Sequence, residues 1–266
     1  MKHSEPKETA NRPETSPSAD KSRRDAMKII RTLEEFRNPE NVAGMARFGI
    51  SSQNTLGVPM PVLRDLAKEV CRDPLLNDNN HGLALELWKT GVHEARILAG
   101  LIDDSELVTE PQMETWAGDF DSWDVCDQVC SNLFDRTAFA IKKADRWAKR
   151  EEEFVKRAGF VLMAALAVHD KSGDDKVFLN FLPIIKREAT DERNFVRKAV
   201  NWALRGIGKR NKILNKAAVK TAKEIQRMDS KTAKWIASDA LRELTSTAVL
   251  KRLTKVKSKK SKVKKT

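Results

Sequence analysis

The chain has 266 residues and a formal net charge of +12, with 40% hydrophobic and 33% charged residues. It has no apolar run near the roughly 18 residues that a membrane span needs, and its N-terminus lacks the hydrophobic segment of a secretory signal. Three cysteines are too few for a disulfide framework, so we expect buried thiols at Cys71, Cys126 and Cys130. Length and composition therefore favour a soluble, helix-rich globular protein with a sizeable core.

Both ends of the chain differ in composition from the rest. Residues 1–22 are rich in Pro, Ser, Thr, Glu and Lys, and we expect them to be disordered. Residues 251–266 hold nine Lys or Arg and no acid, which leaves 41 basic and 38 acidic residues, a net charge of +3, in residues 1–250. We expect this C-terminal segment to be a disordered tail that holds a polyanion without sequence preference. A solubility or localisation appendage is the alternative.

Between the tails, residues 23–250 show helical periodicity with short turn segments and no alternating strand pattern. A weak repeat is present: FVKRAGFVLMAAL (154–166) aligns with FVRKAVNWALRGI (195–207) at an offset of 41 residues, and the second segment aligns loosely with WIASDALRELTS (235–246) at an offset of 40. A period near 40 in helical pairs is typical of HEAT-like α-solenoids. We therefore predict an all-α HEAT-like solenoid with a concave surface.

An acidic segment, DFDSWDVCDQVC (119–130), is unexpected in so basic a chain. A helix is expected to begin within it, which places Asp124 in the first turn, where the helix dipole favours a negative charge. Asp127 follows Trp123 by one turn on the same helix face, beside the apolar stripe. Its carboxylate is therefore expected to be partly desolvated against an indole. A solvated acid that flanks a core tryptophan is the alternative.

Pairs of basic residues recur near the start of two aligned helices. These residues are Lys156, Arg157, Arg197 and Lys198. Stacking of the repeats is expected to place them along one groove suited to a phosphate backbone. Solvated surface charges or ion pairs between repeats are the alternative. Trp202 lies in the second of these helices, near three further basic residues, Arg205, Lys209 and Arg210. It either shields the stems of the neighbouring cations or faces a ligand.

Four stretches carry a resemblance to a known family: NPENVAGMARFGI running into LGVPMPVLRDLAKEV, then SWDVCD, FVKRAGFVL and NFVRKAVNWALR. Together they resemble the AlkD-like DNA glycosylases, HEAT-like repeat proteins that excise cationic alkylated purines, over roughly residues 25–245. The resemblance implies that Asp127 is the catalytic aspartate and that Arg157 lies in the catalytic cleft. It makes Trp123 and Trp202 the two cleft tryptophans. Phe48 stands where the family has a cleft tyrosine, so the hydroxyl group that could bind DNA there is missing.

The resemblance implies a monofunctional DNA glycosylase that hydrolyses the N-glycosidic bond of N3- or N7-alkylated purines in double-stranded DNA. The residues expected to contact the DNA are Phe48, Lys156, Arg197, Lys198, Arg205, Lys209 and Arg210. We expect a monomer without metal, cofactor or membrane partner, in the cytoplasm or, in a eukaryote, the nucleus. Two alternatives stay open: a HEAT-like protein that binds distorted or branched DNA without catalysis, and a helical scaffold for protein partners.

Overall fold

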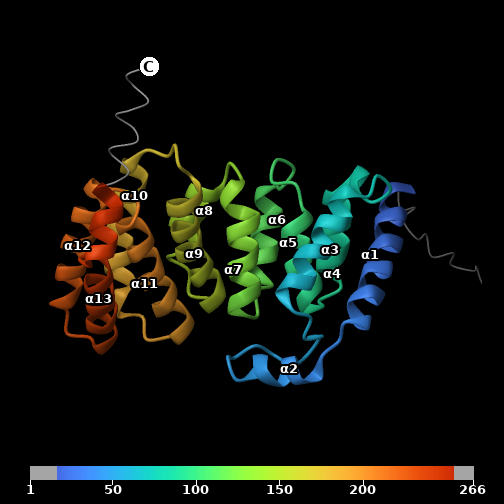
Figure 1. Cartoon of the computed structure of the whole chain (residues 1–266), viewed down its shortest axis with the longest axis horizontal. Helices are drawn as coiled ribbons and strands as arrows, with labels where there is room; N and C mark the ends of the chain where they lie inside the picture. The colour runs from blue at the N-terminus through green and yellow to red at the C-terminus, as the bar shows by residue number, and fades with distance from the viewer. Residues whose placement is uncertain (1–16, 255–266) are drawn as a thin grey trace, which may run out of the picture.

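The computed structural model describes residues 17–254, and every regular element in that range is helical (Figure 1). The all-α prediction is therefore confirmed. None of the described helices is long and apolar enough to cross a membrane. The helices are α1 (Pro17–Glu35), α2 (Pro39–Ala46), α3 (Met60–Arg72), η1 (Asn77–Asn79), α4 (Asn80–Lys89), α5 (His93–Ile102), α6 (Glu110–Gly118), α7 (Trp123–Asn132), η2 (Phe134–Arg136), α8 (Ala140–Trp147), α9 (Glu153–His169), α10 (Asp175–Arg187), η3 (Glu188–Thr190), α11 (Asn194–Gly208), α12 (Lys212–Gln226) and α13 (Lys231–Leu244), followed by a helical stretch at 247–254.

Helices from successive repeats pack side by side in a continuous row. Helix α3 contacts α5, which contacts α7, and the row continues through α9 and α11 to α13. A second layer packs behind it, in which α8 contacts α10 and α10 contacts α12. The three segments aligned in the sequence are α9, α11 and α13, so the predicted repeat of about 40 residues corresponds to successive members of the first row.

Helix α9 is the centre of the core. Residues 155–167 of this helix are all buried, because α7, α8 and α11 pack around it. Gly159 lies where a side chain would not fit, since a Cβ atom there would come within 2.3 Å of the backbone nitrogen of Ala148. Trp88 and Trp147 are core residues, as expected, with 4% and 1% of their surface exposed. Helix α9 is therefore a rigid support for side chains at its N-terminal end.

Helix α2 differs from the others in its direction. It lies crosswise along the lower edge of the row in Figure 1, and the segment that follows it returns to α3. The buried carboxylate of Glu94 holds this returning segment by accepting hydrogen bonds from the backbone nitrogens of Leu56 (2.9 Å), Gly57 (2.7 Å) and Val58 (3.3 Å). Because all three donors are main-chain groups, the path of the loop is fixed close to the start of α5.

The sequence-based boundaries differ from the structure at both ends. We expected disorder up to residue 22, but α1 begins at Pro17, since proline is well tolerated in the first helical turn and Ser22 is buried. We expected the C-terminal tail to start at 251, but residues 251–254 are helical and Leu253 is buried. The rest of both predicted tails lies outside the described residues. The expectation for Cys71 was wrong, because this thiol is exposed.

Candidate active site and nucleic-acid interface

Trp123 and Asp127 lie one turn apart at the start of α7. Ser122 has extended backbone angles and precedes the helix as its N-cap residue. Val125, Cys126, Val129 and Cys130 turn into the core, which fixes the rotation of the helix. Trp123 and Asp127 therefore lie at the edge of the buried face, where both are partly covered; the Asp127 side chain keeps 16% of its surface exposed.

Arg157 of α9 binds Asp127 at two points. Its Nε donates to Oδ1 at 2.9 Å, and its Nη2 donates to Oδ2 at 2.8 Å. Nη1 donates to the backbone oxygen of Phe195 at 2.6 Å, which joins α9 to the first turn of α11. Only 6% of the Arg157 side chain is exposed. The guanidinium is therefore held in one orientation by α7 and α11 together.

Burial and pairing act in opposite directions on this pair. Burial raises the pKa of the Asp127 carboxyl above its ordinary value, and Arg157 opposes part of that rise. Burial also acts to lower the pKa of Arg157, but the hydrogen bonds and charge of Asp127 outweigh it, so this pKa is raised. Because a guanidinium stays protonated and binds the carboxylate at both oxygens, we assign Asp127 the ionised form at neutral pH.

A cavity of about 560 Å³, which we name the cleft cavity, adjoins the pair. It is formed by the end of α2, the first residue of α7, Arg157 of α9 and the first turns of α11. Asp127 is not one of its lining residues; it adjoins the cavity through Arg157. The lining residues are Arg47, Phe48, Gly49, Trp123, Arg157, Asn194, Phe195 and Lys198.

The segment after α2 closes one side of the cleft cavity. Trp123 donates from Nε1 to the backbone oxygen of Phe48 at 3.1 Å, while 69% of the surface of Phe48 is exposed. Gly49 has a φ of +82°, and a Cβ atom there would lie 2.8 Å from Cζ of Phe195. The loop therefore touches both α7 and α11, and it needs glycine at the point of closest approach.

Each aspartate of the acidic segment has a partner on another part of the chain. Asp119 accepts from Nε1 of Trp88 at 2.8 Å, and Asp121 lies 3.4 Å from Nη1 of Arg96. Asp124 lies 2.9 Å from Nε2 of His93, and Asp127 binds Arg157. The segment therefore does not present four bare negative charges, because its acids link α7 and the loop before it to α4, α5 and α9.

His93 and Arg47 were not singled out in the sequence. His93 is buried, and although burial acts to lower its pKa, Asp124 and other nearby acids outweigh this effect and raise it. Its pairing orients Asp124, whose pKa is lowered because the contact with His93 outweighs burial. Arg47 is exposed at the end of α2 and lines the cleft cavity. Its position directly before Phe48, a predicted DNA contact, was the one feature of the sequence that could have identified it.

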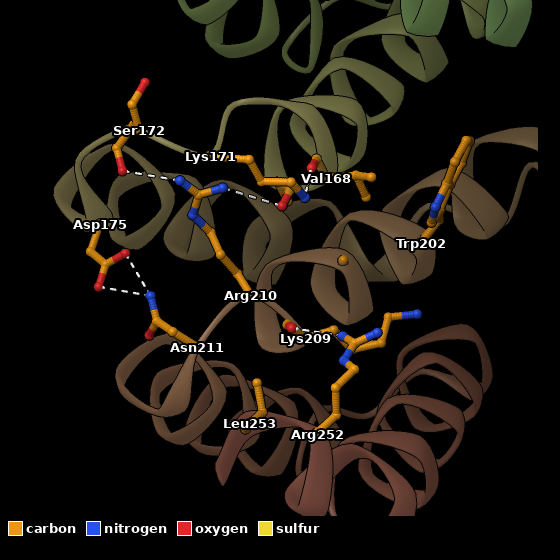
Figure 2. Close-up of a pocket in the computed structure, with 13 residues that line it drawn as sticks. Val168, Lys171, Ser172, Asp175, Trp202, Lys209, Arg210, Asn211, Arg252 and Leu253 are labelled. Carbon is orange, nitrogen blue, oxygen red and sulfur yellow. Dashed lines mark hydrogen bonds between the residues drawn. The ribbon is translucent and has the colours of Figure 1, made fainter. Parts of the chain in front are cut away.

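The structure does not place Trp202 in the cleft cavity. Trp202 lies one turn after Lys198 on α11 and lines a different cavity of about 720 Å³, which we name the Trp202 cavity. Lys198 and Trp202 face the same side of α11, so the two cavities lie along one helix face. In Figure 2 the indole stands at the edge of the Trp202 cavity, across from Arg210. The two predicted cleft tryptophans therefore line two different cavities, Trp123 the cleft cavity and Trp202 the other.

Of the cations predicted to bind phosphate, some are exposed and others are already paired with a carboxylate. Lys198 is exposed and lines the cleft cavity. Lys156 is 7% exposed and lies 2.9 Å from Glu188 and 3.5 Å from Asp191, so the expectation that it lies in an open groove is wrong. Arg157 was expected both to bind phosphate and to act as a counter-charge for Asp127. It is buried and binds both oxygens of Asp127, which agrees with the second role, whereas the open groove position expected for the first is not observed.

The other four predicted cations lie on α11 or directly after it. Arg197 stacks over Trp235 at 5.4 Å, away from the cleft cavity. Arg205 and Lys209 both bind Glu243 of α13, at 2.9 Å and 2.8 Å. Arg210 donates to two backbone oxygens and has no carboxylate partner within residues 17–254. Of the seven predicted DNA contacts, Lys198 and Phe48 are therefore the two whose side chains reach the cleft cavity.

Comparisons with known proteins agree with this architecture. The chain matches the family model described as DNA alkylation repair enzyme over residues 29–244. No curated protein matches the chain. Among solved structures, a similar one has a TM-score of 0.66 and 20% sequence identity, covering 82% of this chain and 94% of that one. It is described as a new family of proteins related to the HEAT-like repeat DNA glycosylases with affinity for branched DNA structures.

At this identity the structural match shows the fold, and it confirms the HEAT-like solenoid that the repeat predicted. The family model spans α2 to α13, including Trp123, Asp127, Arg157 and Trp202. On this match, the chain belongs to the DNA alkylation repair enzyme family.

Proposed function

We propose that this protein is a monofunctional DNA glycosylase that hydrolyses the N-glycosidic bond of N3- or N7-alkylated purines in double-stranded DNA. The observation that carries the proposal is the buried ion pair of Asp127 and Arg157 beside Trp123, next to a cavity with cations at its rim. The chain's membership of a family of DNA alkylation repair enzymes supports a role for this arrangement in DNA repair.

The chemistry of the lesion explains the residue types. An N3- or N7-alkylated purine is already cationic, so it leaves with the electrons of its bond to C1′ without first gaining a proton. The deoxyribose develops oxocarbenium character as this bond breaks, and a water molecule then adds to C1′ and releases a proton to solvent. Because lesion and transition state are both cationic, a fixed carboxylate and an aromatic face stabilise them, and no strong general acid is required.

The chain's own residues take defined parts in this reaction. Asp127 contributes negative charge near C1′, and since both of its oxygens already accept from Arg157, we favour stabilisation by charge over proton abstraction. Arg157 positions that carboxylate. Trp123 offers an indole at the cavity wall, and its hydrogen bond to Phe48 fixes the ring. Lys198 and Arg47, both exposed at the rim, are suited to binding phosphates on either side of the lesion.

Release of free base tests the proposal directly. Duplex DNA that contains N7-methylguanine or N3-methyladenine is incubated with excess protein, and the products are separated to detect the excised base. The unmethylated duplex and protein-free DNA are the controls, because alkylated purines also depart spontaneously. Base release no faster than in the protein-free sample would refute the glycosylase assignment.

One geometric feature favours a second candidate, a non-catalytic protein that binds branched DNA. Arg157 lines the cleft cavity and Asp127 does not, so the cavity wall presents a cation before it presents the acid. The similar solved structure is described as having affinity for branched DNA. This candidate predicts tighter binding to a four-way junction than to a linear duplex of equal length, with no base released from methylated DNA.

A further inference from the structure

The Trp202 cavity and the cleft cavity share no lining residue. It lies between the end of α9, the loop before α10, the second half of α11 and the helical stretch at 247–254 (Figure 2). Its volume of about 720 Å³ is within the range of small-molecule sites, roughly 300–1,000 Å³. The residues that line it are Ala167, Val168, Lys171, Ser172, Gly173, Asp175, Trp202, Gly206, Lys209, Arg210, Asn211, Arg252 and Leu253.

The walls of this cavity carry an excess of positive charge. Four cations line it, Lys171, Lys209, Arg210 and Arg252, against the single carboxylate of Asp175. Lys209 is already paired with Glu243 of α13, so three cations exceed that one acid. Asp175 is already engaged, because Nδ2 of Asn211 donates to its two oxygens at 2.8 Å and 3.0 Å. The cavity therefore attracts an anion.

Two of the guanidinium groups are held by neutral oxygens, and neither is paired with a carboxylate in the part of the chain that the structure describes. Arg210 donates to the backbone oxygens of Ala167 (3.3 Å) and Gly173 (3.1 Å) and stacks over Phe178 at 4.2 Å. Arg252 donates to the backbone oxygen of Lys209 at 2.8 Å. Since carbonyl groups carry no net charge, both positive charges remain available to a ligand, on side chains that are already ordered.

Trp202 adds a flat aromatic wall to this charged site. The indole is partly buried, packs against the core and stands apart from Arg210 across the cavity. An aromatic face on one side and fixed cations on the other are the two features that bind a nucleotide, because the base stacks while the phosphate meets the positive charge. In a paired duplex, neighbouring bases already cover both faces of each base, so the fitting ligand is an unpaired nucleotide.

We propose that the Trp202 cavity binds an unpaired nucleotide of a DNA strand whose duplex part lies at the cleft cavity. This inference rests on the proposed function in one respect, that DNA is the partner. Lys198 at the cleft cavity and Trp202 are four residues apart on one face of α11, about 6 Å along the helix axis. A strand that leaves the cleft cavity therefore reaches the second cavity within one or two nucleotides.

Binding of three fluorescent probes to the full chain tests the inference. The probes are a blunt unmodified duplex, the same duplex with a five-thymidine tail, and the same duplex with a tail of five abasic units. We expect the thymidine tail to bind about tenfold more tightly than the blunt end, from stacking of a base on an aromatic ring. The abasic tail, which keeps the phosphates and lacks the bases, is expected to lose most of that gain.

Two variants and two matched controls locate the effect. Trp202→Ala and Lys171→Glu are expected to abolish the gain from the thymidine tail; Lys171 is exposed, so its substitution leaves the core intact. Trp235→Ala removes another partly exposed tryptophan, and Lys223→Glu reverses the charge of another lysine, neither of which lines the cavity. Both controls are expected to keep the gain. A wild-type protein that binds all three probes equally, or a gain that Trp202→Ala and Lys171→Glu both retain, overturns the inference.

Two further measurements distinguish a strand site from a mononucleotide site and from the catalytic site. Competition by free thymidine monophosphate at concentrations comparable to the tail would overturn the assignment to a strand and indicate a mononucleotide site. Asp127→Asn is expected to keep the gain from the tail while it loses base release. If the wild-type protein releases no base from a blunt methylated duplex yet keeps the gain from the tail, the glycosylase proposal fails and this inference stands.

Discussion

Asp127 is the residue on which the proposed reaction depends. We predict that Asp127→Asn slows release of N7-methylguanine by about 10²- to 10³-fold, since removal of one preorganised electrostatic group costs about 2.7–4 kcal/mol of barrier. Single-turnover kinetics on methylated duplex DNA measures this. Asp121→Asn is the matched control, because that carboxylate lies in the same acidic segment with 60% of its side chain exposed. Equal rates for Asp127→Asn and the wild type would exclude a catalytic role.

The raised pKa of Asp127 gives a pH dependence with a defined sign. The ionised form is the one that stabilises a cationic transition state, so the rate is expected to rise as the pH rises through this pKa. Because burial raises it, the acid limb of the profile lies at higher pH than for an ordinary aspartate. Enzymatic base release between about pH 3.5 and 8, corrected for spontaneous loss, measures the limb. A rate that stays constant down to the pKa of a solvated aspartate, about 3.9, contradicts the assignment.

At the residue scale, the sequence predicted which helix face the site residues occupy better than it predicted their partners in space. Helical spacing correctly put Trp123 and Asp127 at the edge of a buried face. It left open whether Lys156 lies in a groove or forms an ion pair between repeats, and the structure shows the ion pair, with Glu188 and Asp191. The choice could not be made from the sequence, because those acids are more than 30 residues away and meet Lys156 through the stacking of α9 and η3. Trp202 was assigned to the cleft by resemblance, and its neighbours in space come from α9, α10 and the C-terminal stretch.

At the scale of elements, α2 and its following loop close the cleft cavity. We predict that Gly49→Ala lowers the free energy of unfolding by about 1–2 kcal/mol, the cost of a Cβ atom in the left-handed region, and moves the loop away from Phe195. Denaturant unfolding measures the first effect, and the fluorescence of Trp123, which binds the same loop, reports the second.

Gly44→Ala in α2 is the matched control for this prediction. A Cβ atom at Gly44 meets no atom within 4 Å, and the residue lies within a helix, so alanine is expected to be neutral or stabilising. If both alanine variants had the same stability, close packing of the loop against α11 would not hold in solution.

The order of elements was predictable to a large extent. The repeat of about 40 residues identified α9, α11 and α13 as equivalent helices, because each must bury a similar apolar face between two neighbours. The crosswise direction of α2 was not predictable. It depends on hydrogen bonds from Leu56, Gly57 and Val58 to the distant carboxylate of Glu94, for which the local sequence has no signal.

At the scale of the whole molecule, most of the basic excess lies in residues 255–266, outside the described residues. The helical stretch at 247–254 belongs to the fold, because Arg252 and Leu253 line the Trp202 cavity. We predict that deletion of residues 255–266, which removes seven lysines, flattens the salt dependence of DNA binding. For every phosphate that the shortened chain no longer binds, the slope of log K against log salt is expected to fall by about 0.9. An unchanged slope would mean that the tail does not touch DNA.

The pairing of Asp127 with Arg157 also determines the electrostatic potential that acts on an approaching polyanion. The two opposite charges, with donor and acceptor atoms 2.8 Å apart, form a dipole, whose potential falls off more steeply with distance than that of a lone ion. Beyond a screening length of about 10 Å, a phosphate chain is therefore attracted by the unpaired cations and hardly repelled by the acid. In the proposed reaction the negative charge would act only at short range, on a sugar that has already arrived, so capture of the nucleic acid and breakage of its bond would not compete.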